Sequence, residues 1–169
     1  DFAPSDLVSL ETMRPTRPHR CTPPGTQCLR REAARAYQRL ARAMREADLS
    51  PHVSSAFRGY SVQCSTFAGW ASPERGGFCG ATRASALPGH SQHQLGTTID
   101  LFTYAWTNEG DKFRPGFGCS PGGRWIAEHA QEHGFVLPYP LHPDYRRGGS
   151  PCDAVEGGES RIDPRTGYR

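Results

Sequence analysis

One short stretch of the chain combines residue types that can hold a metal ion. His93 lies in a polar loop, Gly96 allows the chain to turn, and Asp100 follows in a segment of alternating polarity that predicts a strand. The turn brings an imidazole and a carboxylate, seven positions apart, close together. Both groups suit a divalent zinc ion. The pair alone does not establish a metal site, because an arbitrary His and Asp more often form local hydrogen bonds.

Arg58 is a second candidate, at an expected turn between a strand and a helix. Alternating apolar residues predict a strand over residues 52–57, and helical spacing predicts a helix over residues 60–70. Such turns often present functional side chains. A guanidinium there can bind a carboxylate or stabilise an oxyanion through charge-assisted hydrogen bonds. The alternative is an ordinary surface salt bridge.

The elements around these candidates mix helices and strands without a regular strand-helix-strand repeat. Apolar positions three and four apart predict helices over residues 29–47 and 121–133, the second ended by Gly134. Alternation predicts strands over residues 97–106 and 135–139. The predicted fold class is α+β, a small antiparallel sheet flanked by helices. Irregular structure is expected in a Pro-rich arm at residues 1–28, a loop at 71–96 and a tail at 140–169.

Length and composition narrow the class of protein. The 169 residues fit one domain, and no apolar run approaches the ~20 residues of a membrane helix. The start at Asp1 lacks a basic and then apolar leader, so we expect a soluble form from which any leader has been removed. The net charge of +3 is dispersed, which gives nucleic-acid binding little support and suits a solvated surface or an anionic cell-wall polymer.

The cysteines favour disulfides over a zinc ribbon or a thioredoxin-type site. Their number, six, is even, and no C-x-x-C pair occurs. Disulfides imply an oxidising compartment, so the expected location is secreted or periplasmic. Connectivity is not determined by sequence. Pairing between sequence neighbours predicts Cys21 with Cys28, Cys64 with Cys79, and Cys119 with Cys152.

Three ordered motifs resemble the zinc D-alanyl-D-alanine carboxypeptidases, whose fold is shared with hedgehog signalling domains. The segment Ser91-x-His93-x-x-Gly96-x-Thr98-x-Asp100 is similar to their S-x-H-x-x-G-x-A-x-D signature, with Thr98 in place of the usual Ala. Residues 55–63 are similar to S-x-x-R-S-x-x-x-Q, with Gly59 in place of Ser, and residues 134–140 to G-F-x-x-x-Y-P. The resemblance covers roughly residues 29–168. It makes residues 1–169 one peptidase domain with an N-terminal arm.

The resemblance also implies roles for individual residues. His93 and Asp100 would be ligands of Zn2+, and Arg58 and Gln63 would face the substrate. Gln63 could hold either Arg58 or a peptide carbonyl. Ser91 could bind the substrate or orient a metal ligand.

A third zinc ligand and a general base are still needed. In the family both lie in an E-x-W-H segment soon after T-G-Y, and this sequence ends at Arg169, directly after Thr166-Gly167-Tyr168. We expect this segment to be omitted from the sequence; the alternative is a form that cannot catalyse. Another alternative is an inverted zinc-peptidase motif, H-x-x-E-H, at residues 129–133. His142 is a further possible ligand, without a spacing argument.

The function that follows from the resemblance is hydrolysis of the terminal D-Ala-D-Ala bond of peptidoglycan stem peptides by a zinc carboxypeptidase. An endopeptidase of the same family and a non-catalytic zinc-containing binding module are the alternatives. The expected partner is the peptidoglycan peptide, with no nucleic acid and no membrane span. A monomer is expected, although sequence does not determine the oligomeric state.

Overall fold

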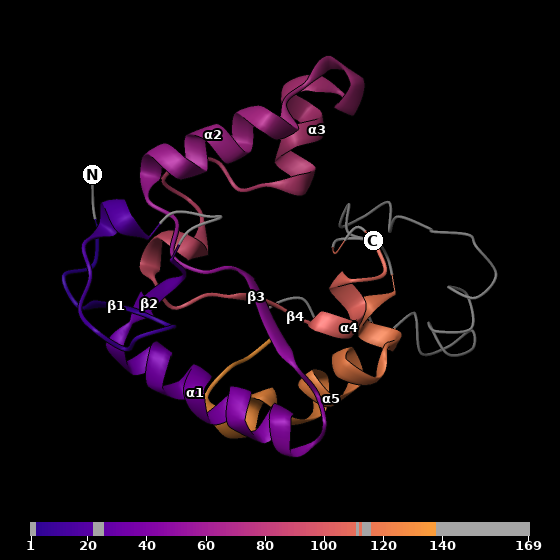
Figure 1. The fold of residues 1–169 in the computed structure, drawn as a ribbon. Coiled ribbons are helices and arrows are strands. Elements are labelled where there is room, and N and C mark those ends of the chain that lie inside the picture. Colours follow the sequence, from indigo (N-terminus) through magenta and orange to yellow (C-terminus); the bar gives the residue numbers. More distant parts are fainter. Residues whose placement is uncertain (1–2, 22–25, 111, 113–115, 138–169) are drawn as a thin grey trace. The chain divides into compact units, whose positions relative to one another are not determined.

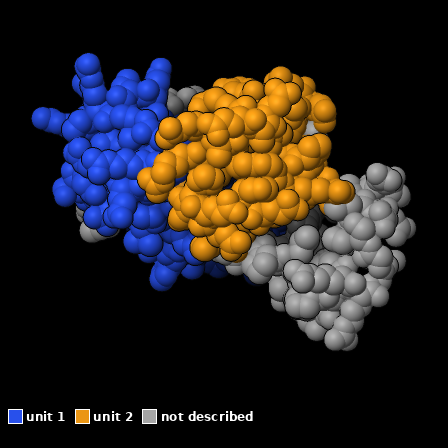
Figure 2. All heavy atoms as spheres, turned by 90° about the horizontal axis from the view of Figure 1, so that it is seen from below, with its two compact units in different colours: residues 1–38, 53–101 blue, residues 39–52, 102–169 orange. Residues whose placement is uncertain are grey.

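The computed structural model describes residues 3–21, 26–110, 112 and 116–137. The chain forms two compact units, residues 1–38 with 53–101 and residues 39–52 with 102–169 (Figure 2). It passes between the units within α1 (Arg31–Glu46), β3 (Pro51–Ser55) and β4 (Asp100–Thr103). All five residues that sequence analysis assigns to the site, His93, Asp100, Arg58, Gln63 and Ser91, belong to the first unit.

A short antiparallel sheet and the start of α1 build the core of the first unit. β1 (Leu7–Ser9) pairs with β2 (Cys28–Arg30), with Val8 opposite Leu29. Both side chains are fully buried and pack with Ala34 and Ala56. This pairing explains one difference from prediction, since Leu29 belongs to the strand and α1 (Arg31–Glu46) begins two residues later than expected. The helix itself is confirmed.

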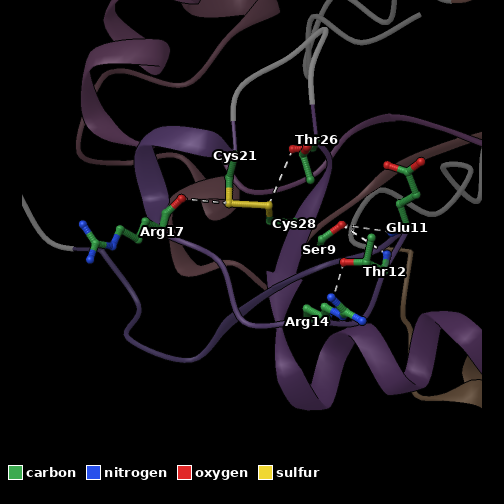
Figure 3. The surroundings of a disulfide bond; sticks show 8 residues. All are labelled: Ser9, Glu11, Thr12, Arg14, Arg17, Cys21, Thr26 and Cys28. Atoms are coloured by element: carbon green, nitrogen blue, oxygen red, sulfur yellow. Dashed lines mark hydrogen bonds between the residues drawn. A yellow bond between two sulfur atoms is a disulfide. The ribbon is translucent and has the colours of Figure 1, made fainter.

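A disulfide fixes the N-terminal arm to this sheet. Cys21 and Cys28 are bonded, with their Cα atoms 5.5 Å apart, as predicted (Figure 3). Both are buried and pack with Leu7 and Phe57. The arm, for which irregular structure was expected, therefore contains a strand, β1, and a 3₁₀ turn, η1 (Pro18–Arg20).

The remaining cysteines follow the prediction less closely. Cys119 is disulfide-bonded, and Cys152, the partner predicted for it, lies outside the described residues. Cys64 and Cys79 are free thiols, so the pairing predicted for them is wrong in this structure. That prediction rested on closeness in sequence, whereas Cys64 and Cys79 lie on two different helices.

Two helices and a second sheet follow along the chain (Figure 1). β3 (Pro51–Ser55) pairs with β4 (Asp100–Thr103), and α2 (Tyr60–Trp70) has the predicted bounds. The predicted loop instead contains η2 (Pro73–Arg75), α3 (Gly77–Ala84) and η3 (Gln92–Leu95). The glycines of α3 are typical of a loop. Gly80 is needed for packing, however, because a Cβ there would collide with the carbonyl of Arg75.

The second unit carries the C-terminal described elements. β4 ends earlier than predicted because the Thr103 hydroxyl accepts a hydrogen bond from the Trp106 amide and starts α4 (Tyr104–Thr107). η4 (Phe117–Cys119) precedes α5 (Pro121–His129) and η5 (Ala130–His133), which confirm the predicted helix, and Gly134 ends it in the left-handed conformation. Residues 135–137 are not a strand, and 138–139 and the tail lie outside the described residues.

The α+β class is confirmed, with small sheets and helices. Among the described helices, none has the length and apolar character needed to cross a membrane.

Candidate metal and substrate site

The turn between His93 and Asp100 is built on the first sheet. Gly96, which ends η3, has φ of 70°. A Cβ at this position would lie 3.1 Å from Arg30 Cγ and 3.2 Å from Leu7 Cδ2, so both conformation and space require glycine. The Arg30 amide donates to the Gly96 carbonyl at 2.8 Å. The core strand β2 thereby fixes the position of the loop that carries His93.

The hydrogen bond of His93 determines which ring nitrogen carries its proton. Nδ1 lies 2.6 Å from the carbonyl oxygen of Ala56, and the side chain is almost fully buried. A carbonyl can only accept, so Nδ1 carries the proton and donates. In the neutral ring, Nε2 then presents a lone pair. This nitrogen lies 3.5 Å from Oδ1 of Asp100, whose side chain is 32% exposed.

This pairing leaves two electron-rich atoms facing each other, an arrangement that a shared cation or an added proton on the imidazole would stabilise. Tetrahedral zinc has bonds of about 2.0–2.2 Å to His nitrogen and carboxylate oxygen, which sets its ligand atoms about 3.4 Å apart. The observed separation of 3.5 Å fits two adjacent ligands of such an ion. No group of three metal-binding side chains occurs within the described residues, so they supply no third ligand.

Arg58 contributes a partly buried positive charge to the same region. It follows β3, and its amide donates to the His93 carbonyl at 3.2 Å. Burial lowers the pKa of its guanidinium, and the negative charge of Asp100 opposes that shift. Nε is buried without a hydrogen-bond partner in the described part of the chain. A buried cation with an unused donor is suited to binding an anionic group.

Gln63 and Ser91 are both buried and lie on segments that frame this region. Gln63 Nε2 donates to the Ala86 carbonyl at 2.7 Å and to the Ser85 hydroxyl at 3.0 Å. Its Oε1 is buried without a hydrogen-bond partner among the described residues. Ser91 precedes η3, but its hydroxyl does not cap that turn. The amide contacts of Gln63 tie α2 to the segment that leads into the His93 loop.

Within the described residues, the H-x-x-E-H alternative does not form a group of three metal-binding side chains. His129 ends α5, and its ring stacks on Trp125 with centroids 4.5 Å apart. Its Nδ1 bonds to the Trp125 carbonyl at 2.9 Å. His133 lies in a 3₁₀ turn, so the two imidazoles do not share one continuous α-helix. His142 lies outside the described residues.

Sequence reasoning missed one group of the site, the carbonyl of Ala56. This oxygen orients His93 from 37 residues away, and a backbone atom leaves no signal in the residue types.

Comparison with protein-family models assigns the chain to a family. The family model VanY, D-alanyl-D-alanine carboxypeptidase, matches residues 26–149, well over half of the chain. The chain belongs to the VanY family. The matched range contains His93, Asp100 and Arg58, and the resemblance drawn from the motifs is confirmed.

Individual relatives agree with this assignment. The chain is 30% identical over 116 residues to YodJ, a candidate carboxypeptidase of Bacillus subtilis (strain 168), covering 69% of this chain and 41% of YodJ. It is similar to the structure of the LdcB LD-carboxypeptidase, with 25% identity and a TM-score of 0.63 over 86% of this chain and 64% of that one.

A vancomycin-resistance D,D-pentapeptidase VanY variant in complex with Zn(II) shares the fold, with 21% identity and a TM-score of 0.55 over 80% of each chain. This VanY-family chain thus spans about two fifths of YodJ and less than two thirds of LdcB.

Proposed function

We propose that this protein is a zinc-dependent D,D-carboxypeptidase that hydrolyses the terminal D-Ala-D-Ala bond of peptidoglycan stem peptides. The observation that carries the proposal is the pair formed by His93 Nε2 and Asp100 Oδ1, 3.5 Å apart, in a member of the VanY family. Its support also includes the Zn(II) of the VanY neighbour.

In this proposal, residues of the first unit bind the zinc ion and orient the peptide substrate. The Ala56 carbonyl holds His93 so that Nε2 faces the metal position, and Asp100 presents Oδ1 beside it. When bound, zinc supplies Lewis acidity that acidifies a water molecule and polarises the scissile carbonyl. The guanidinium of Arg58 binds the terminal carboxylate of the peptide.

Two further residues have supporting roles. Ser91 contacts the substrate or orients a metal ligand. Gln63 Oε1, which has no hydrogen-bond partner among the described residues, accepts from Arg58 or from the substrate. The third ligand and the general base that this chemistry requires are assigned to no residue of the described chain. An activity outside the cytoplasm is consistent with the Cys21–Cys28 disulfide.

An L,D-carboxypeptidase is a second candidate, favoured by the similarity to LdcB over 86% of this chain. The two activities differ in the residue before the terminal D-Ala. A pentapeptide ending in D-Ala-D-Ala and a tetrapeptide ending in an L-residue followed by D-Ala separate them. Release of larger fragments from purified peptidoglycan would instead favour an endopeptidase.

The decisive experiment combines metal analysis with hydrolysis by the intact protein. Purified protein should contain zinc and release free D-Ala from the pentapeptide, and His93→Ala should lose both properties. His90→Ala is the matched control, because His90 is an exposed imidazole three residues away. Full zinc content and full activity in His93→Ala would refute the proposal, and zinc binding without hydrolysis by the wild type would favour a binding module.

A further inference from the structure

Tyr60 is a large aromatic residue that the fold leaves open beside Arg58. It is the first residue of α2 and is 43% exposed. Gln63 and Phe67 continue the same stripe of the helix at positions i+3 and i+7, and both are buried. The later residues of this stripe are therefore buried, and only the first, Tyr60, remains accessible to solvent. Tyr60 lies two positions after Arg58 in the sequence.

The ring of Tyr60 extends toward the loop that carries His93. A Cβ built on Gly89 would lie 3.8 Å from Tyr60 Cε2, an ordinary van der Waals distance. The turn around Gly89 is well defined. The His90 amide donates to the Leu87 carbonyl at 2.9 Å, and the Gly89 amide donates to Gln94 Oε1 at 2.7 Å.

Gln94 is the residue directly after His93, and its amide bonds to the Ser91 carbonyl. The phenol ring consequently lies near a turn that is held to the same short loop as the candidate metal ligand. Because 43% of Tyr60 is exposed, its side chain is accessible to a ligand.

We propose that Tyr60 is a specificity-determining residue, whose ring restricts the C-terminal residue of the substrate to a small side chain such as that of D-alanine. This inference rests on the proposed function, in which Arg58 binds the terminal carboxylate. Two residues span at most ~7 Å, so the Tyr60 backbone lies within that distance of Arg58. A methyl group fits beside the ring, whereas a branched side chain would compete with it for space.

The test compares two synthetic peptides that differ only in their last residue, D-Ala or D-Leu. Initial rates are measured with the intact, zinc-loaded protein. Wild type should prefer D-Ala by about tenfold or more, the scale on which a pocket discriminates added methylene groups. Tyr60→Ala should lower kcat/KM for the D-Ala peptide, raise it for the D-Leu peptide, and so shift the preference by about tenfold.

Two control variants test whether a change in the preference for D-Ala over D-Leu is specific to the ring of Tyr60. Tyr60→Phe preserves the ring and should keep the wild-type preference. Phe78→Ala removes another exposed aromatic residue of the first unit, on α3, and should leave the preference unchanged. Because a general loss of folding lowers both rates together, only a change in their ratio supports the inference.

The outcomes separate this inference from the proposed function. Absence of hydrolysis of either peptide by the wild type contradicts the proposed function, and the preference is then measured as the binding of the same two peptides by calorimetry. An unchanged preference in Tyr60→Ala, in rates or in binding, overturns the role of Tyr60. A wild type that does not discriminate the peptides, or binds neither, also overturns it.

Discussion

Replacing Gly96 by alanine perturbs the turn that joins the two candidate zinc ligands. At φ of 70° an alanine is in the left-handed region, which costs about 1–2 kcal/mol for a residue with a Cβ. The new methyl group would also lie 3.2 Å from the Cδ2 of Leu7, a side chain that is 1% exposed and has little room to move. Overpacking of this kind typically costs about 1–3 kcal/mol. Together these terms predict a loss of about 2–5 kcal/mol in the free energy of unfolding.

Urea unfolding of the wild type and of Gly96→Ala measures this loss. Gly69→Ala is the matched control, because Gly69 lies inside α2, has no positive φ, and has no neighbouring atom within 4 Å of an added Cβ. Alanine has the higher helix propensity, so the control should gain up to about 1 kcal/mol. The same substitution is thus expected to have opposite signs at the two positions.

The perturbation should also reach the site. Strain at the end of η3 is relieved by movement of the loop, which would change the separation of His93 Nε2 and Asp100 Oδ1 and weaken zinc binding. A Gly96→Ala protein with wild-type stability and wild-type zinc affinity would refute the reasoning, because it would mean that neither the conformation nor the packing of this turn matters.

Two further predictions concern charged groups. Arg58→Gln should lower kcat/KM for the D-Ala-D-Ala peptide by about ten- to a hundredfold, since hydrogen bonds to charged groups contribute about 1.5–3 kcal/mol. The zinc content should not change. An unaltered kcat/KM would exclude Arg58 from carboxylate binding. Burial, and secondarily the charge of Lys112, lowers the pKa of His52 below 6.5. The unfolded chain then binds more protons near and below this pH than the folded protein does. The contribution of the neutral His52 imidazole to stability is therefore present above about pH 6.5 and is lost as the pH falls. His52→Gln should weaken the pH dependence of stability in urea unfolding, and an identical profile would contradict the assignment.

Local patterns were sufficient for the elements whose residues interact mainly with their own neighbours. The spacing of apolar residues in α2 predicted both of its ends, and Gly134 predicted the end of the helical segment that includes α5 and η5. The types and order of His93, Gly96 and Asp100, together with the motif around Arg58, were enough to identify the family, because each motif is a short run of residue types.

Predictions failed where packing and pairing contacts, which residue types do not reveal, determine the local structure. The glycines of α3 favoured a loop, but Gly80 allows the close approach of the Arg75 carbonyl and the helix forms. Leu29 fits a helical pattern but pairs with Val8 in a strand. The pairing of Cys64 with Cys79 was inferred from closeness in sequence, which does not fix the separation of two side chains on different helices.

The sequence by itself determined the family and predicted which residues bind a metal and a carboxylate, because residue type and spacing are local properties. Only the tertiary structure decided how they are oriented. The tautomer of His93 depends on a carbonyl 37 residues earlier, and the turn at Gly96 depends on side chains of β1 and β2. Each of these contacts joins residues far apart in the chain, and only folding brings them together.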